Sequence, residues 1–439
     1  MLNVILSNKE FIKKRVPPFI WCGLRSVYLF PRKFWVWCYV VFYRAIILPK
    51  ILKRKQKKER LTVVFLALNV SMWKFDGLFR LLQKNPRFNP IVVSSVRPNE
   101  SETEQRLDQE KMAEFFRGRG FEFIQGFDFE RKTRFPLASL SPDIIFYPQP
   151  YMGITAKEYE FTKQRDALFC YLPYAFETTA EEYTYNNAYQ NVAWRIFLPT
   201  DLHKTYAEAI SQIRGKNCVI TGYPTADEYA NLIVEKSPWA VGDSRKRVIW
   251  SPHHSIMSRE MFGTSSFLEY FDAMLSIAEK FRDRVVFAFK PHPMLITKLY
   301  KVWGKKKTDL YYEKWARMEN SFQALGEYRD LFIESDALIH DCGSFTVEYL
   351  YAGKPVMYVF KKNRTAKESG FGKQAIAVHY HGHSCADIER FIEETVLGGN
   401  DPKRAEREAF FQKYLLPPNG QSVAKNILDE LERGLTWKK

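Results

Sequence analysis

The 439-residue sequence has few cysteines, few histidines and no long uncharged apolar run. Its six cysteines are scattered without CxxC spacing, which predicts neither a disulfide framework nor a zinc module and fits a reducing cytosol. No run reaches the roughly 20 uncharged apolar residues that span a bilayer, so a polytopic membrane protein is excluded. Hydrophobic residues make up 46% of the chain and charged residues 26%, which excludes disorder as the main state. A length prior of about 150 residues per domain allows two or three domains.

Positive charge is concentrated at one end of the chain. The net charge is +16, and residues 1–60 hold fifteen basic and two acidic side chains. The other 379 residues hold 51 basic and 48 acidic side chains, a net charge of +3. The basic run 53–60 (KRKQKKER) could bind nucleic acid, but no recognised nucleic-acid motif accompanies it. We therefore expect no nucleic-acid partner.

The basic end also carries an apolar, aromatic stretch at residues 34–49, interrupted by Arg44 and flanked by Arg32, Lys33 and the basic run. Because the stretch is shorter than a bilayer span, we expect a peripheral helix in the headgroup layer of an anionic membrane surface. The aromatic residues expected at the interface are Trp21, Tyr28, Trp35, Trp37, Tyr39 and Tyr43. The alternatives are an aromatic helix packed on the next domain with a solvated basic linker, or a tilted or re-entrant insertion. The segment offers no signal-peptide cleavage site.

From residue 61 onward, short apolar runs alternate with polar helical stretches, which predicts an α/β protein with parallel sheets. The first series of expected strands is 61–68, 90–96, 121–126, 143–147, 168–172, 195–198 and 218–221; the second is 247–250, 284–289, 331–333, 337–339, 355–360 and 375–378. The expected organisation is a membrane-association segment (1–60), a first Rossmann-like domain (61–225), a linker (226–246), a second Rossmann-like domain (247–400) and C-terminal helices (401–439). Two such domains place a cleft between them, with ligands at the carboxyl ends of the strands.

Four of the eight histidines, His253, His254, His292 and His340, lie at or just after strands of the second series, so we expect them at the cleft mouth. Two prolines flank His292 and fix the backbone where the chain leaves the strand. An imidazole there can donate a hydrogen bond to a phosphoryl oxygen or transfer a proton. For any one of these histidines, the alternative is a loop residue without a chemical role.

The segment 335–348 (SDALIHDCGSFTVE) is a strand that ends in a Gly-Ser turn and opens a helix. The backbone N–H groups of Gly343, Ser344 and Phe345 are expected to hold a diphosphate at the positive end of the helix. Glu348, one turn further on, is placed to accept hydrogen bonds from a ribose. The alternative is an N-capped helix in which Ser344 binds only its own backbone.

These motifs together resemble the bacterial CDP-glycerol glycerophosphotransferases of the teichoic-acid and capsule polymerase type. The resemblance rests on Lys290-Pro-His-Pro, on Ser-Asp-x-Leu-Ile-x-Asp-x-x-Ser with Glu348 four positions later, and on Gly-Lys-Pro-Val, mainly within residues 245–360. It implies a GT-B fold, a CDP-activated donor in the second domain, and transfer of a polyol phosphate to a lipid-linked acceptor at the cytoplasmic membrane face. It also implies that His292 contacts donor phosphate, Ser344 the diphosphate and Glu348 the ribose. Since GT-B transferases generally act without a bound metal, we expect no metal and no cofactor.

The sequence departs from this family in the first domain. Teichoic-acid polymerases have a His-Gly-Thr-Pro element whose His is the general base, and Tyr174 stands in its place here. Because a tyrosine with a pKa near 10 is a poor base at neutral pH, Glu177 is the better candidate, with His203 behind it. The site residues expected are therefore His292, Glu177 and His253 for catalysis, Lys290, His254, Asp341, Gly343, Ser344, Phe345 and Glu348 for the donor, and Tyr174 and His203 on the acceptor side.

Other interpretations stay open. A GT-B nucleotide-sugar glycosyltransferase of capsule or surface polysaccharide synthesis, a two-domain sugar epimerase, or a non-catalytic membrane scaffold would share this architecture. His379, His381 and His383 alternate, so on one strand face they could bind a metal.

Overall fold

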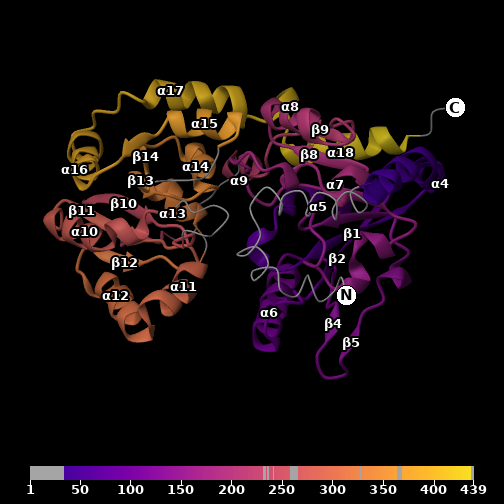
Figure 1. Cartoon of the computed structure of the whole chain (residues 1–439), viewed down its shortest axis with the longest axis horizontal. Coiled ribbons are helices and arrows are strands. Elements are labelled where there is room, and N and C mark those ends of the chain that lie inside the picture. The colour runs from indigo at the N-terminus through magenta and orange to yellow at the C-terminus, as the bar shows by residue number, and fades with distance from the viewer. Residues whose placement is uncertain are drawn as a thin grey trace, which may run out of the picture.

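The computed structural model describes residues 34–436, except 231–233, 235–236, 241, 258–264, 327 and 363–367. These residues form two lobes, each built on a parallel sheet with helices packed against it (Figure 1). The described residues therefore form an α/β protein with two parallel sheets.

The first sheet has seven strands in the order β3-β2-β1-β6-β7-β8-β9. Its strands are β1 (Leu61–Ala67), β2 (Phe88–Ser94), β3 (Phe123–Ile124), β6 (Ile144–Tyr147), β7 (Leu168–Tyr171), β8 (Arg195–Leu198) and β9 (Cys218–Ile220); β4 (Phe127–Asp128) and β5 (Thr133–Arg134) form a separate antiparallel pair. The central strands are buried along almost their whole length, as expected for parallel strands covered on both faces.

The second sheet has six strands in the order β12-β11-β10-β13-β14-β15. Its strands are β10 (Lys246–Ser251), β11 (Val285–Phe289), β12 (Ser321–Gln323), β13 (Ala337–His340), β14 (Val356–Val359) and β15 (Tyr380–Gly382). The strand order reverses between β10 and β13, and parallel sheets bind ligands at such a switch point, outside the carboxyl ends of the strands.

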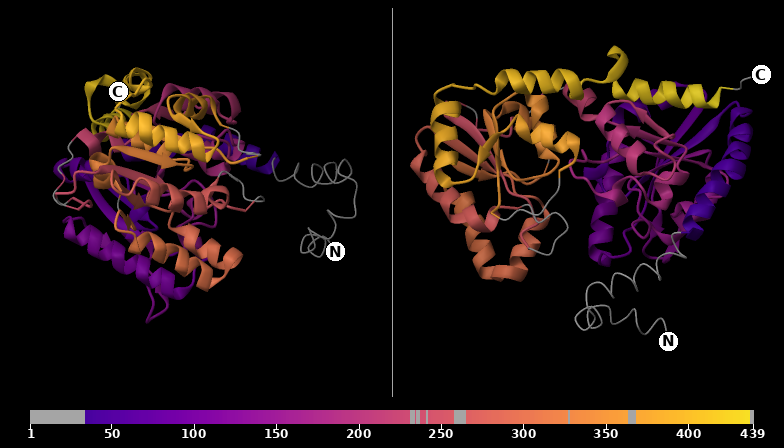
Figure 2. Two further views of the ribbon diagram at one scale, coloured as in Figure 1. Left: turned by 90° about the vertical axis from the view of Figure 1, so that its left-hand side faces the viewer. Right: turned by 45° about the horizontal axis from the view of Figure 1, so that its top comes forward.

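Helices connect the strands of each lobe. The first lobe holds α4 (Leu48–Gln56), α5 (Asp76–Lys84), α6 (Glu102–Gly118), α7 (Ala188–Val192), α8 (Asp201–Ile210) and α9 (Thr225–Ala230); the second holds α10 (Phe267–Lys280), α11 (Met294–Trp303), α12 (Lys305–Arg317), α13 (Arg329–Glu334), α14 (Phe345–Glu348), α15 (Gly370–Ala377), α16 (Cys385–Arg390) and α17 (Arg404–Phe410). The last helix, α18 (Val423–Leu435), returns to the first lobe and buries its apolar face in that core (Figures 1 and 2). Asp227 of α9 accepts hydrogen bonds from the first backbone N–H groups of α18, at 2.7 Å from Val423 and 2.8 Å from Ala424.

Two of the predicted strands are wrong. Residues 331–333 lie in α13 and residues 375–378 lie in and just after α15, whereas β12 and β15 were not predicted. A run of three or four apolar residues has the same pattern in a short buried helix as in a short buried strand, so periodicity could not separate them.

The apolar stretch near the N-terminus is part of a longer helix than predicted. Residues 34–56 are continuously helical, and by length and composition alone this 23-residue helix could cross a membrane, which is weak evidence because a core helix passes the same test. One face packs on the first lobe: Arg44 donates to the carbonyl of Ala193 at 3.1 Å, and buried Lys55 pairs with buried Asp143 at 2.9 Å. Trp35 and Phe42 on the other face stay 70% and 54% exposed. The expected contacts of Trp21, Tyr28, Arg32 and Lys33 lie outside the described residues.

Candidate active site

Hydrogen bonds join the segments that follow β10, β11 and β13 into one surface. The Ser251 hydroxyl donates to the carbonyl of Lys290 at 2.6 Å, and the His292 N–H donates to the carbonyl of Pro252 at 3.0 Å. The Cys342 thiol lies 3.2 Å from the carbonyl of Ser251. The motifs that carry His253, His292 and Ser344 therefore adjoin at the switch point of the second sheet.

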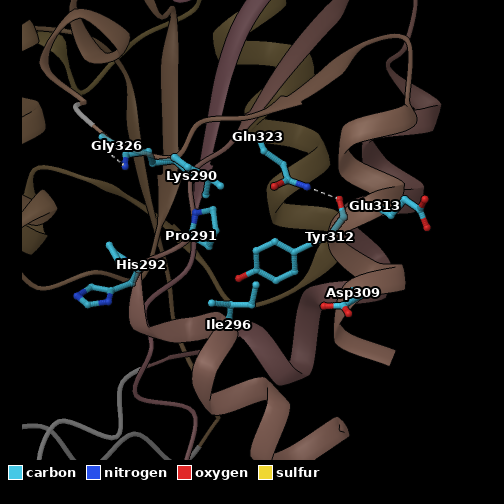
Figure 3. A pocket seen from close by; sticks show the side chains of 11 residues that line it. Lys290, Pro291, His292, Ile296, Asp309, Tyr312, Glu313, Gln323 and Gly326 are labelled. Carbon is cyan, nitrogen blue, oxygen red and sulfur yellow. Dashed lines mark hydrogen bonds between the residues drawn. The ribbon is translucent and has the colours of Figure 1, made fainter. Parts of the chain in front are cut away.

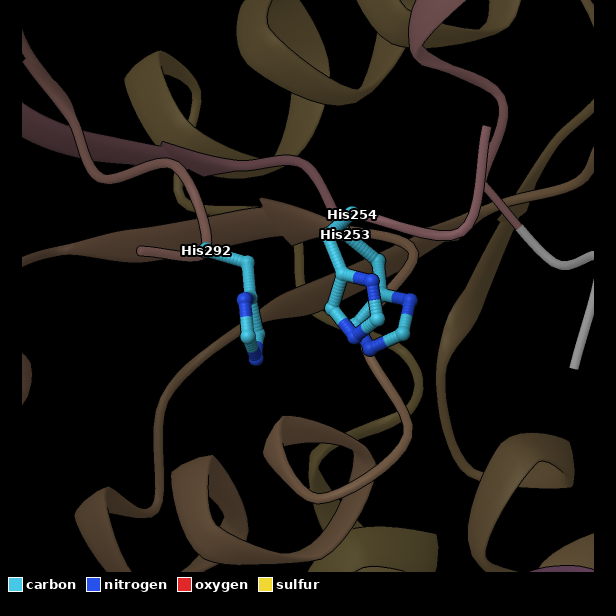
Figure 4. A group of neighbouring side chains, drawn as sticks. All are labelled: His253, His254 and His292. Atoms are coloured by element: carbon cyan, nitrogen blue, oxygen red, sulfur yellow. The ribbon is translucent and has the colours of Figure 1, made fainter. Parts of the chain in front are cut away.

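Three of the predicted histidines form one cluster (Figure 4). The ring centroids of His253 and His254 lie 4.2 Å apart, those of His254 and His292 4.2 Å apart, and those of His253 and His292 5.1 Å apart. Burial lowers the pKa of His254 to about 4 and that of His292 to about 3, and it lowers the pKa of His253 well below its usual value. All three imidazoles are therefore neutral at pH 7.

The backbone fixes the tautomers of two of these rings. The Met294 N–H donates to Nδ1 of His292 at 3.1 Å, and the Ser255 N–H donates to Nδ1 of His253 at 3.2 Å. Since a neutral imidazole carries one proton, Nε2 of each ring bears the hydrogen and donates. A metal ligand needs a free lone pair at that atom, so the cluster fits an anion such as a phosphate better than a cation.

Asp341 holds the backbone of the segment that carries this cluster. Its buried carboxylate accepts hydrogen bonds from the backbone N–H groups of His253, at 2.5 Å, and Ser266, at 2.6 Å. Burial raises the pKa of Asp341, while these hydrogen bonds oppose the rise. The structure thus gives Asp341 a backbone-holding position, in place of the direct donor contact that we expected.

The Gly-Ser turn after β13 is half open to solvent. Gly343 is exposed, Ser344 and Phe345 are half-buried, and the Ser344 hydroxyl makes no capping bond to the helix. The predicted N-cap alternative is therefore not realised. The turn begins two residues after Asp341, whose carboxylate accepts the backbone N–H of His253, so the turn and the segment that carries the histidine cluster adjoin.

The buried histidines His340 and His379 brace the same turn. Cys342 N–H donates to Nδ1 of His340 at 3.1 Å, Nε2 of His340 lies 3.4 Å from Nδ1 of His379, and Nε2 of His379 donates to the Thr346 carbonyl at 2.9 Å. Only one pair of neutral tautomers satisfies all three bonds. The prediction that His340 points toward the cleft is wrong, because its side chain is 1% exposed and faces the interior.

The open alternative of a metal at His379, His381 and His383 is not supported by the positions of these rings. Among the described residues, the group of three ligands close enough for a metal is His253, His254 and His292. His379 is buried on Thr346, and Nε2 of His381 donates to the Ile376 carbonyl at 3.0 Å. Only residues 380–382 form the strand, so the three rings do not share a face.

Lys290 and Glu348 have internal partners. Lys290 is buried, and its amine donates to the Gly326 carbonyl at 2.7 Å. Glu348 is buried and accepts the hydroxyl of Tyr328, and burial raises its pKa. The predicted contact between Glu348 and a ribose stays a prediction.

A cavity of about 630 Å³ lies beside these residues, lined by Lys290, Tyr312 and Gln323 among others (Figure 3). Figure 3 shows the ring of His292 pointing away from Tyr312 and Gln323. His292 is nevertheless among the residues that line the cavity, so the cavity borders the histidine cluster.

The first lobe brings Thr178, the residue after Glu177, to the Gly343-Ser344 turn. The half-buried carboxylate of Glu177 accepts hydrogen bonds from the backbone N–H, at 3.1 Å, and the hydroxyl of Thr179. Burial raises the pKa of Glu177, which moves it toward the range of a general base at neutral pH. The next residue, Thr178, has its hydroxyl oxygen 3.7 Å from the point where a Cβ of Gly343 would lie.

His203 and Tyr174 flank Glu177 differently. His203 is 3% exposed, with its pKa lowered by burial to about 4, and its Nε2 donates to the Glu177 carbonyl at 3.0 Å. It therefore supports the backbone of Glu177. Tyr174 is 37% exposed, and burial of its hydroxyl raises its pKa, which makes it a still poorer base.

Sequence reasoning missed Thr178, His379 as a partner of His340, and the backbone role of Asp341. No local pattern marks them, because each contact joins residues more than 30 positions apart.

A family model described as CDP-Glycerol:Poly(glycerophosphate) glycerophosphotransferase matches residues 157–431. The chain belongs to this family. It is a CDP-glycerol glycerophosphotransferase-like transferase, and the resemblance seen in its motifs is confirmed. No curated protein matches the chain.

Solved structures show the same fold. A variant of the wall teichoic acid polymerase TagF matches with a TM-score of 0.54 at 11% identity, covering 92% of this chain and 98% of that one. A putative UDP-N-acetylglucosamine 2-epimerase from Listeria monocytogenes matches with a TM-score of 0.56 at 14% identity, covering 85% and 96%. The UDP-GlcNAc 2-epimerase from Neisseria meningitidis, bound to UDP-GlcNAc, matches with a TM-score of 0.56 at 14% identity, covering 85% and 100%. The predicted GT-B fold is confirmed.

Proposed function

We propose that the protein transfers a polyol phosphate, glycerol phosphate or similar, from a CDP-activated donor to a lipid-linked acceptor at the cytoplasmic face of the cell membrane. Family membership supports the reaction type. One TagF structure, solved after a soak with CDPG, matches this chain with a TM-score of 0.52 at 12% identity. The observation that carries the proposal is the cluster of neutral imidazoles beside the Gly343-Ser344 turn.

In the proposed reaction, an acceptor hydroxyl oxygen attacks the phosphorus that bears the polyol. The bond from this phosphorus to the bridging oxygen breaks, a phosphodiester forms, and CMP leaves with the bridging oxygen. Glu177 takes the proton of the acceptor hydroxyl. The Nε2–H groups of His253 and His292 donate to the diphosphate oxygens as negative charge grows on the leaving group.

His292→Ala tests the proposal most directly. We expect turnover to fall by at least about 100-fold, since removing one preorganised donor costs that much elsewhere, with little change in melting temperature. His383→Ala is the matched control, because its ring is exposed and packs against the rings of Phe360 and His381, outside the cluster. A folded His292→Ala protein with full activity would exclude the assignment.

The donor is identified by a panel of CDP-glycerol, CDP-ribitol, UDP-sugars and CMP-sugars, with release of CMP, UDP or CDP as the readout. Release of CMP from CDP-glycerol or CDP-ribitol, dependent on acceptor, supports the proposal. Turnover of a sugar nucleotide alone would favour the glycosyltransferase alternative. No turnover, and no rise in melting temperature with CDP, would favour the scaffold alternative.

The membrane part of the proposal rests on the exposed face of the helix over residues 34–56. Trp35 and Trp37, in the first turn of this helix, are 70% and 51% exposed, and basic residues at 53–58 lie at the opposite end of the helix. Trp35→Glu/Trp37→Glu is expected to abolish flotation with anionic vesicles, while Leu416→Glu, at another exposed apolar site, leaves it unchanged. Equal flotation of both proteins would contradict the peripheral contact.

A further inference from the structure

A main-chain contact joins the two lobes. In the first lobe it involves the segment that carries the proposed base Glu177, and in the second lobe, the donor lobe of the proposed reaction, it involves the start of α15. The Ser369 N–H donates to the Thr178 carbonyl at 2.9 Å, and Thr179 forms an antiparallel bridge with Glu368. We call this contact, between residues 176–179 and 368–372, the interdomain bridge. It lies one residue from the Glu177 carboxylate.

The interdomain bridge leaves no room for a side chain at position 372. A Cβ added to Gly372 would lie 2.0 Å from the Thr178 carbonyl oxygen. Real contacts of this kind are at least about 3 Å, so any side chain there must push the Thr178 carbonyl away by about 1 Å or more. The chain therefore depends on glycine at position 372 for this approach.

Aromatic side chains also pack across the interdomain bridge. The Phe371 ring of α15 stacks on Phe176, with centroids 5.8 Å apart and planes at 12°. It also lies 4.5 Å from the ring of His203, which donates to the Glu177 carbonyl. The backbone of Glu177 is thus fixed on both sides by contacts that include the donor lobe.

The bridge also connects to the carboxylate itself. Thr179 uses its backbone N–H and its hydroxyl to bind Oε1 of Glu177, and the same residue pairs with Glu368. Displacement of residues 178–179 therefore displaces both hydrogen-bond donors of the carboxylate.

We propose that Gly372 and the Ser369 N–H are positioning groups for catalysis: they hold the Glu177 carboxylate of the first lobe at the donor turn of the second lobe. The inference rests on the proposed function, in which Glu177 is the base. It adds that the base is placed by the donor lobe, and that the two lobes must be joined at residues 178 and 369 for the acceptor hydroxyl to be activated.

Two matched pairs of variants test this. Gly372→Ala introduces the clash, whereas a Cβ on Gly370, two residues earlier in α15, meets nothing within 4 Å. Ser369→Pro removes the N–H at a residue whose φ of −65° already suits proline, whereas Ser369→Ala keeps the N–H and loses only the cap on Gly372 N–H. In each pair the first variant breaks the bridge and the second does not.

With the donor that the wild type uses, we expect Gly372→Ala and Ser369→Pro to lower kcat by about 10-fold to 100-fold relative to their partners, since a misplacement of 1 Å has that effect. KM for the donor and Kd for CDP should change by less than about two-fold. The acid limb of the kcat profile should move, because displacement of residues 178–179 changes both the burial of Glu177 and its hydrogen bonds from Thr179, which together set its pKa.

A merely structural bridge would lower the melting temperature without changing kcat below it or moving the acid limb, and that result would overturn the inference. Equal kcat within both pairs would overturn it as well, while leaving the proposed function standing. A wild type without turnover on any donor would overturn the proposed function, and the inference with it. If Gly372→Ala fails to fold, the Ser369 pair decides.

Discussion

In the proposed reaction, Glu177 is the side chain that accepts the proton of the acceptor hydroxyl. Its carboxylate is half-buried, its pKa is raised by burial, and Thr178 beside it lies against Gly343 of the donor turn. Glu177→Gln keeps the hydrogen bond from Thr179 N–H but cannot take a proton, so we expect kcat to fall by about 100-fold to 10,000-fold. The measurement is CMP release between pH 6 and 9.

Two controls make the Glu177 result specific. Tyr174→Phe should keep kcat within about two-fold, because burial raises the pKa of the Tyr174 hydroxyl and makes it a poorer base. Glu181→Gln removes a carboxylate near Glu177 and leaves the Glu177 side chain itself unchanged. If Glu177→Gln keeps its turnover across this pH range, another group accepts the proton.

The turn at the start of α14 depends on two buried histidines that have no contact with the substrate in the proposed reaction. His340 and His379 connect the Cys342 N–H to the Thr346 carbonyl through three hydrogen bonds. Removing one ring leaves buried polar groups unpaired, which costs about 1–3 kcal/mol per group.

We expect His379→Ala to raise KM for the donor by at least about 10-fold and to lower the melting temperature, because Ser344 and Gly343 lose their fixed position. His379→Gln can still donate to the Thr346 carbonyl and should recover part of the loss. The measurements are the KM of the donor and the Kd of CDP for both variants. Equal donor affinity in wild type and His379→Ala would show that the turn is held by other contacts.

The elements also show what a sequence can and cannot indicate here. Strands β10, β11 and β13 were predicted close to their true bounds, and since parallel strands end at one edge, the convergence of His253, His254 and His292 followed. The short elements α13, α15, β12 and β15 were not predicted correctly. A run of three apolar residues is too short to show a helical or a strand period. The interdomain bridge could not be predicted, since Thr178 and Gly372 meet only through packing of whole lobes.

Six of the eight histidines are held in their neutral form by burial. Burial lowers the pKa to about 4 in His203 and His254 and to about 3 in His292 and His340, and it lowers the pKa of His253 and His379 as well. In the unfolded chain each would titrate near 6.5. Between these values the unfolded state binds more protons than the folded state, so stability is full above about pH 6.5 and is lost as the pH falls.

Buried carboxyl groups act in the opposite direction at lower pH. Burial raises the pKa of Asp341, Glu177 and Glu348, so the folded state takes up these protons more readily than the unfolded state, whose carboxyl groups titrate near 4. The histidine effect begins near pH 6.5 and reaches its full slope about one pH unit lower, so we expect stability to fall more and more steeply from about pH 6.5 to pH 5.

The check is the melting temperature of the full chain from pH 8 to pH 5, which should be level above pH 7 and fall below about pH 6.5. Each buried histidine contributes at most about 1.4 kcal/mol per pH unit. His340→Asn keeps an acceptor for the Cys342 N–H but removes one titrating group, so its melting temperature should fall less steeply with acid than that of the wild type. His383→Asn, at an exposed ring, should leave the slope unchanged. A melting temperature that stays constant down to pH 5 would mean that these rings are not neutral and buried together in solution.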